Sequence, residues 1–217
     1  RPDGAAASGA PVAPRWGRTL REAARHPFFW VVTAAVGTSG MLATAVAFHQ
    51  ISILGERGLS TTEAAANFLP QTAAGIAATM LTGLLVDRVA PRWLVAASML
   101  SLASGLAWGV VVSPGWSAIG FGLAIGSAGA SIRAFEAAAV PRFFGTAHVG
   151  ALRGFVAAVS VGSTAFGPLL FAVARESAGS YTVVLLGSAL APLAVVVAGF
   201  LIGPPASRSV PLISGVT

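Results

Sequence analysis

Six runs of mostly apolar residues, each about as long as a membrane span, dominate this sequence. They lie at 27–54, 64–86, 93–112, 116–140, 150–173 and 181–202. Because a helix needs about 20 apolar residues to cross the hydrocarbon core, and because lipid offers no partners to backbone polar groups, each run predicts a transmembrane helix. Only 9% of the residues are charged, against about 25% in a soluble domain. The chain is therefore predicted to be an all-α, multi-pass membrane protein with six transmembrane helices.

The arginines predict which way the helices run. All of the basic residues are arginine, and only Arg57 and Arg175 fall on one side of the predicted membrane. The other side holds Arg1, Arg15, Arg18, Arg21, Arg25, Arg88, Arg92, Arg142, Arg153 and Arg208. Since cytoplasmic loops carry the excess of basic residues, both termini are predicted to lie in the cytoplasm, with the helices in the cell membrane. The same bias accounts for the net charge of +6 without nucleic acid as a partner.

The segments outside the apolar runs differ in composition. Residues 1–18 are rich in Pro, Gly and Ala, as in a linker, and Thr19 followed by Glu22 predicts a capping box and a short helix on the membrane surface. We therefore divide the chain into a cytoplasmic linker at 1–26, a six-helix bundle at 27–203 and a cytoplasmic tail at 204–217. The lipid bilayer is the first predicted partner.

This sequence lacks the residues on which most classes of enzyme depend. There is no cysteine, the three histidines are scattered, and no phosphate-binding loop occurs, so neither a metal nor another cofactor is predicted. The string Gly-Thr-Ser-Gly at 37–40 matches a motif of intramembrane serine proteases. His49, however, lies on the same predicted helix, roughly 15 Å along it, where it cannot serve as the base. We therefore expect no enzymatic activity.

The connection at 83–92 resembles the loop signature of the major facilitator superfamily. Gly83, Leu85, Asp87, Arg88 and Arg92 match that signature, while Ala90 and Pro91 replace a glycine and a basic residue. The stretches 48–60 and 141–154 resemble the outer end of helix seven and the loop between helices ten and eleven in bacterial relatives of monocarboxylate transporters. The resemblance covers about residues 19–203. It implies the C-terminal half of a twelve-helix transporter, whose N-terminal six-helix half is the partner that completes the substrate cavity.

The resemblance also gives the loop a role. It implies a conformational latch, in which Gly83 permits close helix approach and Asp87 accepts hydrogen bonds from a neighbouring helix N-terminus. Arg88 and Arg92 then lie at the anionic membrane surface. Plain anchoring of the topology by arginine is the alternative. The stretch at 167–179 outlines a similar loop on the opposite side, which favours an inverted repeat of three plus three helices.

Arg133 and Glu136 stand inside the fourth apolar run. They are three residues apart, hence on one helix face. With the membrane boundary near Arg142, Arg133 lies about 13 Å inside it and leans away from it. Intramembrane charges usually face a cavity or a partner. We therefore predict that Arg133 attracts an anionic substrate and that Glu136 pairs with it or exchanges a proton; a structural ion pair is the alternative.

Further polar and small residues lie in other runs. His49, Gln50, Asn67 and Gln71 are candidates for lining an external vestibule, or for hydrogen bonding between helices. Ser160, Gly162, Ser163, Thr164 and Gly167 form a stripe suited to close helix packing.

These residues and the resemblance together predict a secondary transporter of a small organic solute. Candidate substrates are a monocarboxylate or another organic anion, carried in symport with a proton. Drug or metabolite efflux by the same fold, and a six-helix unit without transport activity, remain the alternatives.

Overall fold

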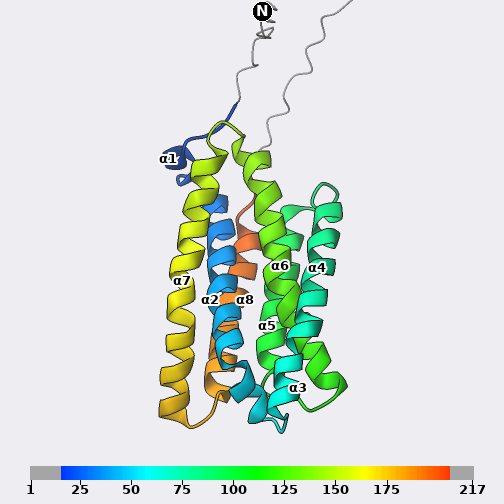
Figure 1. The fold of residues 1–217 in the computed structure, drawn as a ribbon. Helices are drawn as coiled ribbons and strands as arrows, with labels where there is room; N and C mark the ends of the chain where they lie inside the picture. Colours follow the sequence, from blue (N-terminus) through cyan, green and yellow to red (C-terminus); the bar gives the residue numbers. More distant parts are fainter. Residues whose placement is uncertain (1–15, 206–217) are drawn as a thin grey trace, which may run out of the picture.

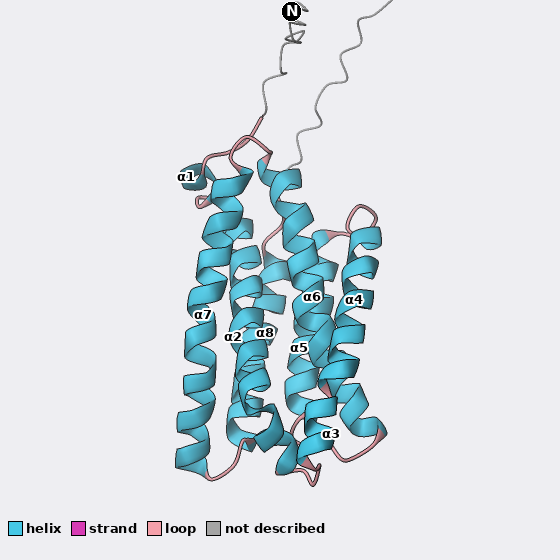
Figure 2. Cartoon of the chain, viewed as in Figure 1, coloured by secondary structure: helices cyan, strands magenta, loops and turns pink. Residues whose placement is uncertain are grey.

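The computed structural model describes residues 16–205, and this part of the chain is helical almost throughout (Figures 1 and 2). The predicted linker before Trp16 and the tail after Pro205 lie outside the described residues. The helices are α1 (Leu20–Ala23), α2 (Pro27–Gly55), α3 (Thr61–Ala66), α4 (Phe68–Leu85), α5 (Pro91–Trp108), α6 (Trp116–Phe144), α7 (Val149–Ala178) and α8 (Thr182–Leu201). The predicted all-α fold is confirmed for the described residues, and so is the capping box of Thr19 and Glu22 that starts α1.

Five helices in the described part are long and apolar enough to cross a membrane: α2, the combined α3 and α4, α6, α7 and α8. α5 was predicted as a sixth span, but it is not among them. It is only 18 residues long, and its first turn contains Pro91 and Arg92, so no longer stretch of apolar residues is available to cross the membrane. α5 nevertheless packs along α6 and α8 within the bundle.

Glycine and proline set the helix ends, and some ends differ from the prediction. α6 continues through Pro141 to Phe144, because a proline removes one backbone donor without forcing a turn; the chain turns at Gly145, where φ is +83°. α7 likewise runs on to Ala178 and ends at Gly179, with φ +70°. The second predicted span is divided at Asn67, since Pro70 cannot donate to the carbonyl of residue 66.

The bundle has two layers. α7, α2, α6 and α4 lie side by side at the front, with α8 and α5 behind them (Figure 1). α2 packs mainly on α7 and α4 on α6, while α5 joins α6 to α8. The start of α2 and the end of α8 lie at the end of the bundle that carries α1.

The core consists of two apolar clusters, one towards each end of the bundle. Along α2 the first cluster ends at Val36 and the second begins at Leu42; along α6 the corresponding residues are Ile132 and Ala128. The layer between the clusters is built from small and polar residues, such as those at 37–40 of α2. The two apolar halves therefore hold a less apolar middle layer between them.

Glycines allow α2 and α7 to approach closely in this middle layer. A Cβ atom on Gly167 would overlap the backbone carbonyl oxygen of Met41, and one on Gly40 would lie 2.6 Å from the Ser160 hydroxyl. A Cβ on Gly37 would lie 3.3 Å from the Ser163 hydroxyl, whereas a Cβ on Gly162 would meet nothing within 4 Å. The predicted small-residue stripe of α7 is thus a packing surface along most of its length. The two glycines of the Gly-Thr-Ser-Gly string have the same role on α2.

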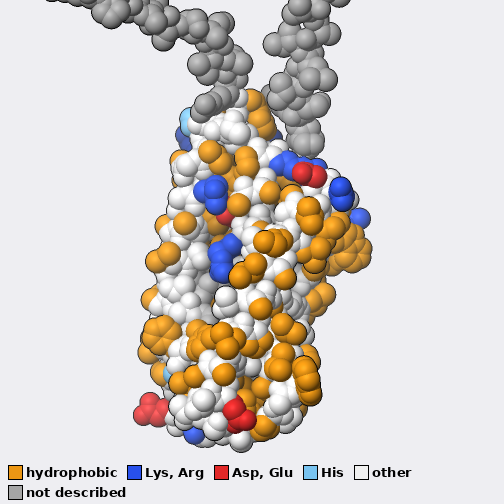
Figure 3. Space-filling model, turned by 45° about the vertical axis from the view of Figure 1, so that its right-hand side comes forward, with side chains coloured by type: hydrophobic (Ala, Val, Ile, Leu, Met, Phe, Trp, Pro, Cys, Tyr) orange, Lys and Arg blue, Asp and Glu red, His pale blue; other side chains and the backbone are white. Residues whose placement is uncertain are grey.

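The outer surface of the bundle is strongly apolar. Figure 3 shows hydrophobic side chains spread over one face, with the charged side chains mostly towards the two ends. Large exposed residues include Met80 and Leu84 on α4, Phe166 on α7 and Leu190 on α8. Only 6% of the apolar window of α3–α4 is buried inside the bundle. Such a surface is stable against lipid and would aggregate in water.

Candidate functional site

A groove of about 410 Å³ opens between α2, α4 and α6, beside the middle layer. Most of its lining is small or apolar, which leaves room near the backbone. Its polar side chains are Thr44 of α2, Gln71 and Thr72 of α4, and Arg133 of α6. Gly126 and Gly129 lie on its α6 wall; a Cβ on Gly126 would overlap the backbone of Gln71. The groove therefore depends on a close glycine contact between α4 and α6.

Arg133 brings the only charge to the described lining of this groove. Its side chain is exposed, and among the described residues it has no ion-pair or hydrogen-bond partner. A Cβ placed on Gly129 would lie 3.4 Å from both Arg133 Nη1 and Ser39 Oγ. Ser39 Oγ is buried and also lacks a partner within the described chain.

Glu136 does not pair with Arg133. Its Oε1 accepts a hydrogen bond from Nε of Arg153 on α7, at 3.3 Å. The carboxylate side chain is 9% exposed, so this ion pair supplies the charge that a buried carboxylate requires. The expectation of an Arg133–Glu136 pair was wrong because the α6–α7 turn brings Arg153 to Glu136. Within the described part of the chain, Arg133 is left without a counter-charge.

The other polar candidates on α2 and α4 form hydrogen bonds between helices. Gln71 Nε2 donates to Gln50 Oε1 at 2.6 Å and to Asn67 Oδ1 at 3.1 Å. Gln50 donates in turn to the carbonyl of Ala64, and Asn67 to that of Ala118. The network joins α2, α3, α4 and α6 at one end of the groove. Gln71 therefore lines the groove and also belongs to this hydrogen-bond network. Gln50 and Asn67 are buried and hold the helices together.

His49 faces away from the groove. Its Nε2 lies 3.1 Å from the carbonyl oxygen of Pro168, and its Nδ1 lies 3.0 Å from the hydroxyl of Tyr181. Since a carbonyl can only accept, Nε2 carries the proton and Nδ1 accepts from Tyr181. His49 thus links α2 to α7 and α8.

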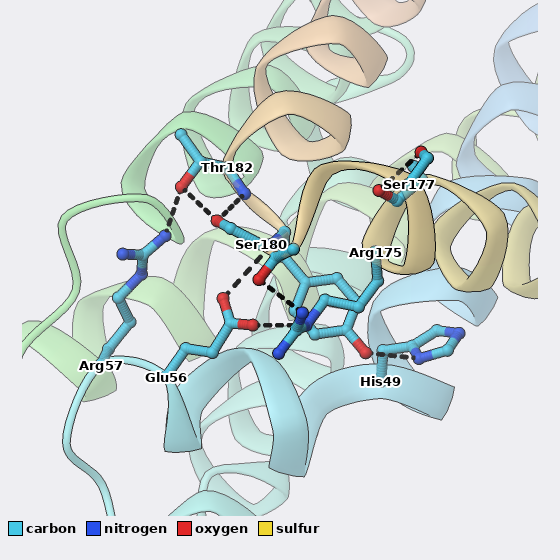
Figure 4. Close-up of polar contacts among 10 residues, drawn as sticks. His49, Glu56, Arg57, Arg175, Ser177, Ser180 and Thr182 are labelled. Atoms are coloured by element: carbon cyan, nitrogen blue, oxygen red, sulfur yellow. Dashed lines mark hydrogen bonds and ion pairs between the residues drawn. The ribbon is translucent and has the colours of Figure 1, made fainter.

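A cluster of ion pairs and hydrogen bonds closes the end of the bundle opposite α1 (Figure 4). Glu56, at the end of α2, pairs with Arg175 of α7 at 2.6 Å and accepts from the backbone N–H of Tyr181 at 3.3 Å. Arg57 donates to the Thr182 hydroxyl and to the carbonyl of Gly109. These contacts tie the end of α2 to the α7–α8 turn. They also place Arg57 and Arg175 at the end opposite to α1, as the arginine pattern predicted.

The loop motif makes a different contact from the one predicted. Asp87 pairs with the side chain of Arg142 at the end of α6, at 3.1 Å, instead of with a helix N-terminus. Arg142 also donates to the carbonyl of Val86 at 2.8 Å. Gly83 is exposed, and a Cβ there would meet nothing within 4 Å, so it allows no close helix contact here. Arg88 and Arg92 are exposed at the same end.

Sequence reasoning missed several residues of the groove and its surroundings. Thr44, Thr72 and Ser39 carry no charge and have no distinctive spacing, so only their position around Arg133 identifies them. The Glu136–Arg153 pair could have been found, because antiparallel α6 and α7 place residues near a turn side by side. No group of three or more potential metal-ligating side chains occurs in residues 16–205.

Fold and surface together define a helical, multi-pass membrane protein with a mostly apolar groove at mid-bundle that Arg133 lines. Neither protein-family models nor curated proteins give a match to this sequence.

Proposed function

We propose that this chain is half of a secondary transporter of the major facilitator type, which moves a small organic anion across the cell membrane by alternating access. One observation carries the proposal: the guanidinium of Arg133 lies at mid-bundle in a groove, and residues 16–205 give it no counter-charge. An unpaired charge in a membrane span is costly, and such charges usually serve a substrate or ion pathway. A carboxylate fits this position because guanidinium binds it through two parallel hydrogen bonds.

The packing of the helices supports an inverted repeat. In a three-plus-three repeat, α2 corresponds to α6, α4 to α7 and α5 to α8. The contact of α2 with α7 then corresponds to that of α6 with α4, and these are the two most extensive contacts in the bundle. In transporters with such a repeat, the substrate site lies near mid-membrane between the repeats, and the mid-bundle position of Arg133 agrees with this arrangement.

The charged contacts at the two ends of the bundle suit a protein that alternates between two states. Asp87–Arg142 lies at one end and Glu56–Arg175 at the other. Surface ion pairs are individually weak, about 0–1 kcal/mol, so they can break and re-form during each cycle. The resemblance of 83–92 to the superfamily loop agrees with a latch at the α1 end.

A second six-helix half would cover the open side of the groove. With it, the groove becomes a cavity that excludes lipid, and the alternation exposes Arg133 to each side in turn. Proton symport is part of this proposal, with Glu136 as the candidate carrier. Its protonation would release Arg153.

Uptake into proteoliposomes tests the proposed function. The full-length protein that carries this chain is reconstituted and offered labelled small carboxylates and a neutral solute of similar size, with and without an inward proton gradient. We expect carboxylate uptake that rises with the gradient, and little uptake of the neutral solute. If no carboxylate enters, the anion transporter proposal is wrong; uptake without gradient dependence removes only the proton coupling.

A further inference from the structure

Two adjacent cavities lie beside α1, and Arg25 lines both. The first, of about 420 Å³, is bordered by Trp16, Gly17, Arg18, Glu22, Arg25 and His26. The second, of about 370 Å³, runs between the start of α2 and the end of α8. The first cavity is polar and basic, and the second is apolar. Arg25 lies where the polar lining gives way to the apolar one. Neither cavity belongs to the Arg133 groove.

The apolar cavity is a groove along the bundle surface. Pro27, Trp30, Val31 and Ala34 follow one face of α2, over about 10 Å of helix, and Val195, Ala198 and Ile202 face them from α8. The indole N–H of Trp30 donates to the carbonyl of Ala24 at 2.8 Å, which fixes the ring at the groove's upper edge. Trp rings usually lie at the level of the lipid headgroups. The groove therefore begins at the membrane interface and runs into the hydrocarbon region.

The polar cavity carries positive charge at that same level. Arg25 is exposed, and its side chain has no hydrogen-bond or ion-pair partner among residues 16–205. Glu22 also lines the cavity, but its carboxylate accepts from the Thr19 N–H at 2.8 Å and from the Thr19 hydroxyl at 2.9 Å. These two hydrogen bonds, the backbone one foremost, hold the pKa of Glu22 below its ordinary value. The Glu22 charge is thus engaged mainly by the helix cap and more weakly by Arg18, while Arg25 remains available to an anion that Arg18 can also approach.

We infer that these cavities bind one anionic phospholipid, with its phosphate at Arg25 and Arg18 and one acyl chain in the α2–α8 groove. A free phosphate would use only the basic cavity and a neutral lipid only the apolar one. The two cavities meet at Arg25, and this junction fits a molecule that is anionic at one end and apolar at the other. The site shares no lining residue with the proposed solute groove and does not depend on transport activity.

Native mass spectrometry of the purified full-length protein tests this inference. It is titrated with phosphatidylglycerol and with phosphatidylcholine carrying the same acyl chains. We expect phosphatidylglycerol to bind more tightly, and Arg25→Ala to weaken it about fivefold, the effect of one arginine near an anionic surface. Arg21→Ala is the matched control, since Arg21 is exposed on α1, four residues before Arg25, but lines neither cavity; it should leave the affinity unchanged. Ala34→Phe, which fills the groove, should weaken both lipids.

Three results would overturn the inference. One is equal affinity for the two lipids. Another is an equal loss for Arg21→Ala and Arg25→Ala, which would mean diffuse attraction to a basic surface. The third is displacement of phosphatidylglycerol by inorganic phosphate at the same concentration, which would mean a phosphate site without an acyl-chain groove. The thermal unfolding midpoint of each variant shows whether it is folded. If Arg25→Ala does not fold, Ala34→Phe still tests the inference.

Discussion

Arg133→Ala is expected to abolish carboxylate uptake while the protein still folds and inserts. The guanidinium is exposed in the groove and pairs with nothing in the described chain, so its removal breaks no contact within the bundle. A hydrogen bond to a charged group contributes about 1.5–3 kcal/mol, which predicts a loss of at least about tenfold in uptake. Arg133→Lys keeps the charge but loses the planar fork, so it should retain part of the activity.

The same proteoliposome assay measures these variants, with the amount of protein in each membrane determined in parallel. Arg21→Ala serves as the control for loss of a surface arginine. Unchanged uptake by Arg133→Ala would remove Arg133 from the solute site and leave the proposal without its main support. Equal activity of the lysine and arginine forms would show that only charge, and not carboxylate geometry, matters there.

Gly167→Ala is expected to destabilise the bundle, whereas Gly162→Ala, five residues away on the same helix, is not. A Cβ at Gly167 overlaps the backbone of α2 at Met41, and backbone cannot move aside without separating α2 from α7. Overpacking of this kind costs about 1–3 kcal/mol. A Cβ at Gly162 points into open space, and alanine is the better helix former by about 1 kcal/mol.

The thermal unfolding midpoint in detergent, followed by size-exclusion fluorescence, compares the two variants with the wild type. Gly167→Ala should unfold at a lower temperature, and Gly162→Ala at the same temperature or a higher one. A lower midpoint for both would indicate that flexibility of α7, and not its contact with α2, is what the glycines provide.

The fold could be predicted from sequence because apolar length alone determines where a helix can cross lipid. Five of the six predicted runs correspond to helices long and apolar enough to span. The remaining run forms α5, which is only 18 residues long and includes Pro91 and Arg92 in its first turn. Helix ends were predicted less well, since Pro141 resembles a terminator but only Gly145 has the backbone conformation that ends α6.

The candidate site could be predicted only in part. A charge in an apolar run is visible in sequence, so Arg133 was found, but its partners depend on which helices meet. Glu136 is three residues from Arg133 on the same face, and yet the neighbouring helix supplies Arg153 instead. Ser39 and Thr44 lie on α2, and Thr72 lies on α4. Only the packing of α2, α4 and α6 brings these residues to the groove or its surroundings.

Protection of a single cysteine in the groove tests the central claim most directly. The chain contains no cysteine, so Thr72→Cys introduces its first thiol, on the α4 wall of the groove that Arg133 also lines. We predict that a small carboxylate slows labelling of this thiol by a cationic thiol reagent, and that Arg133→Ala removes the protection. Labelling that the carboxylate does not slow, or protection that survives without Arg133, would contradict the account.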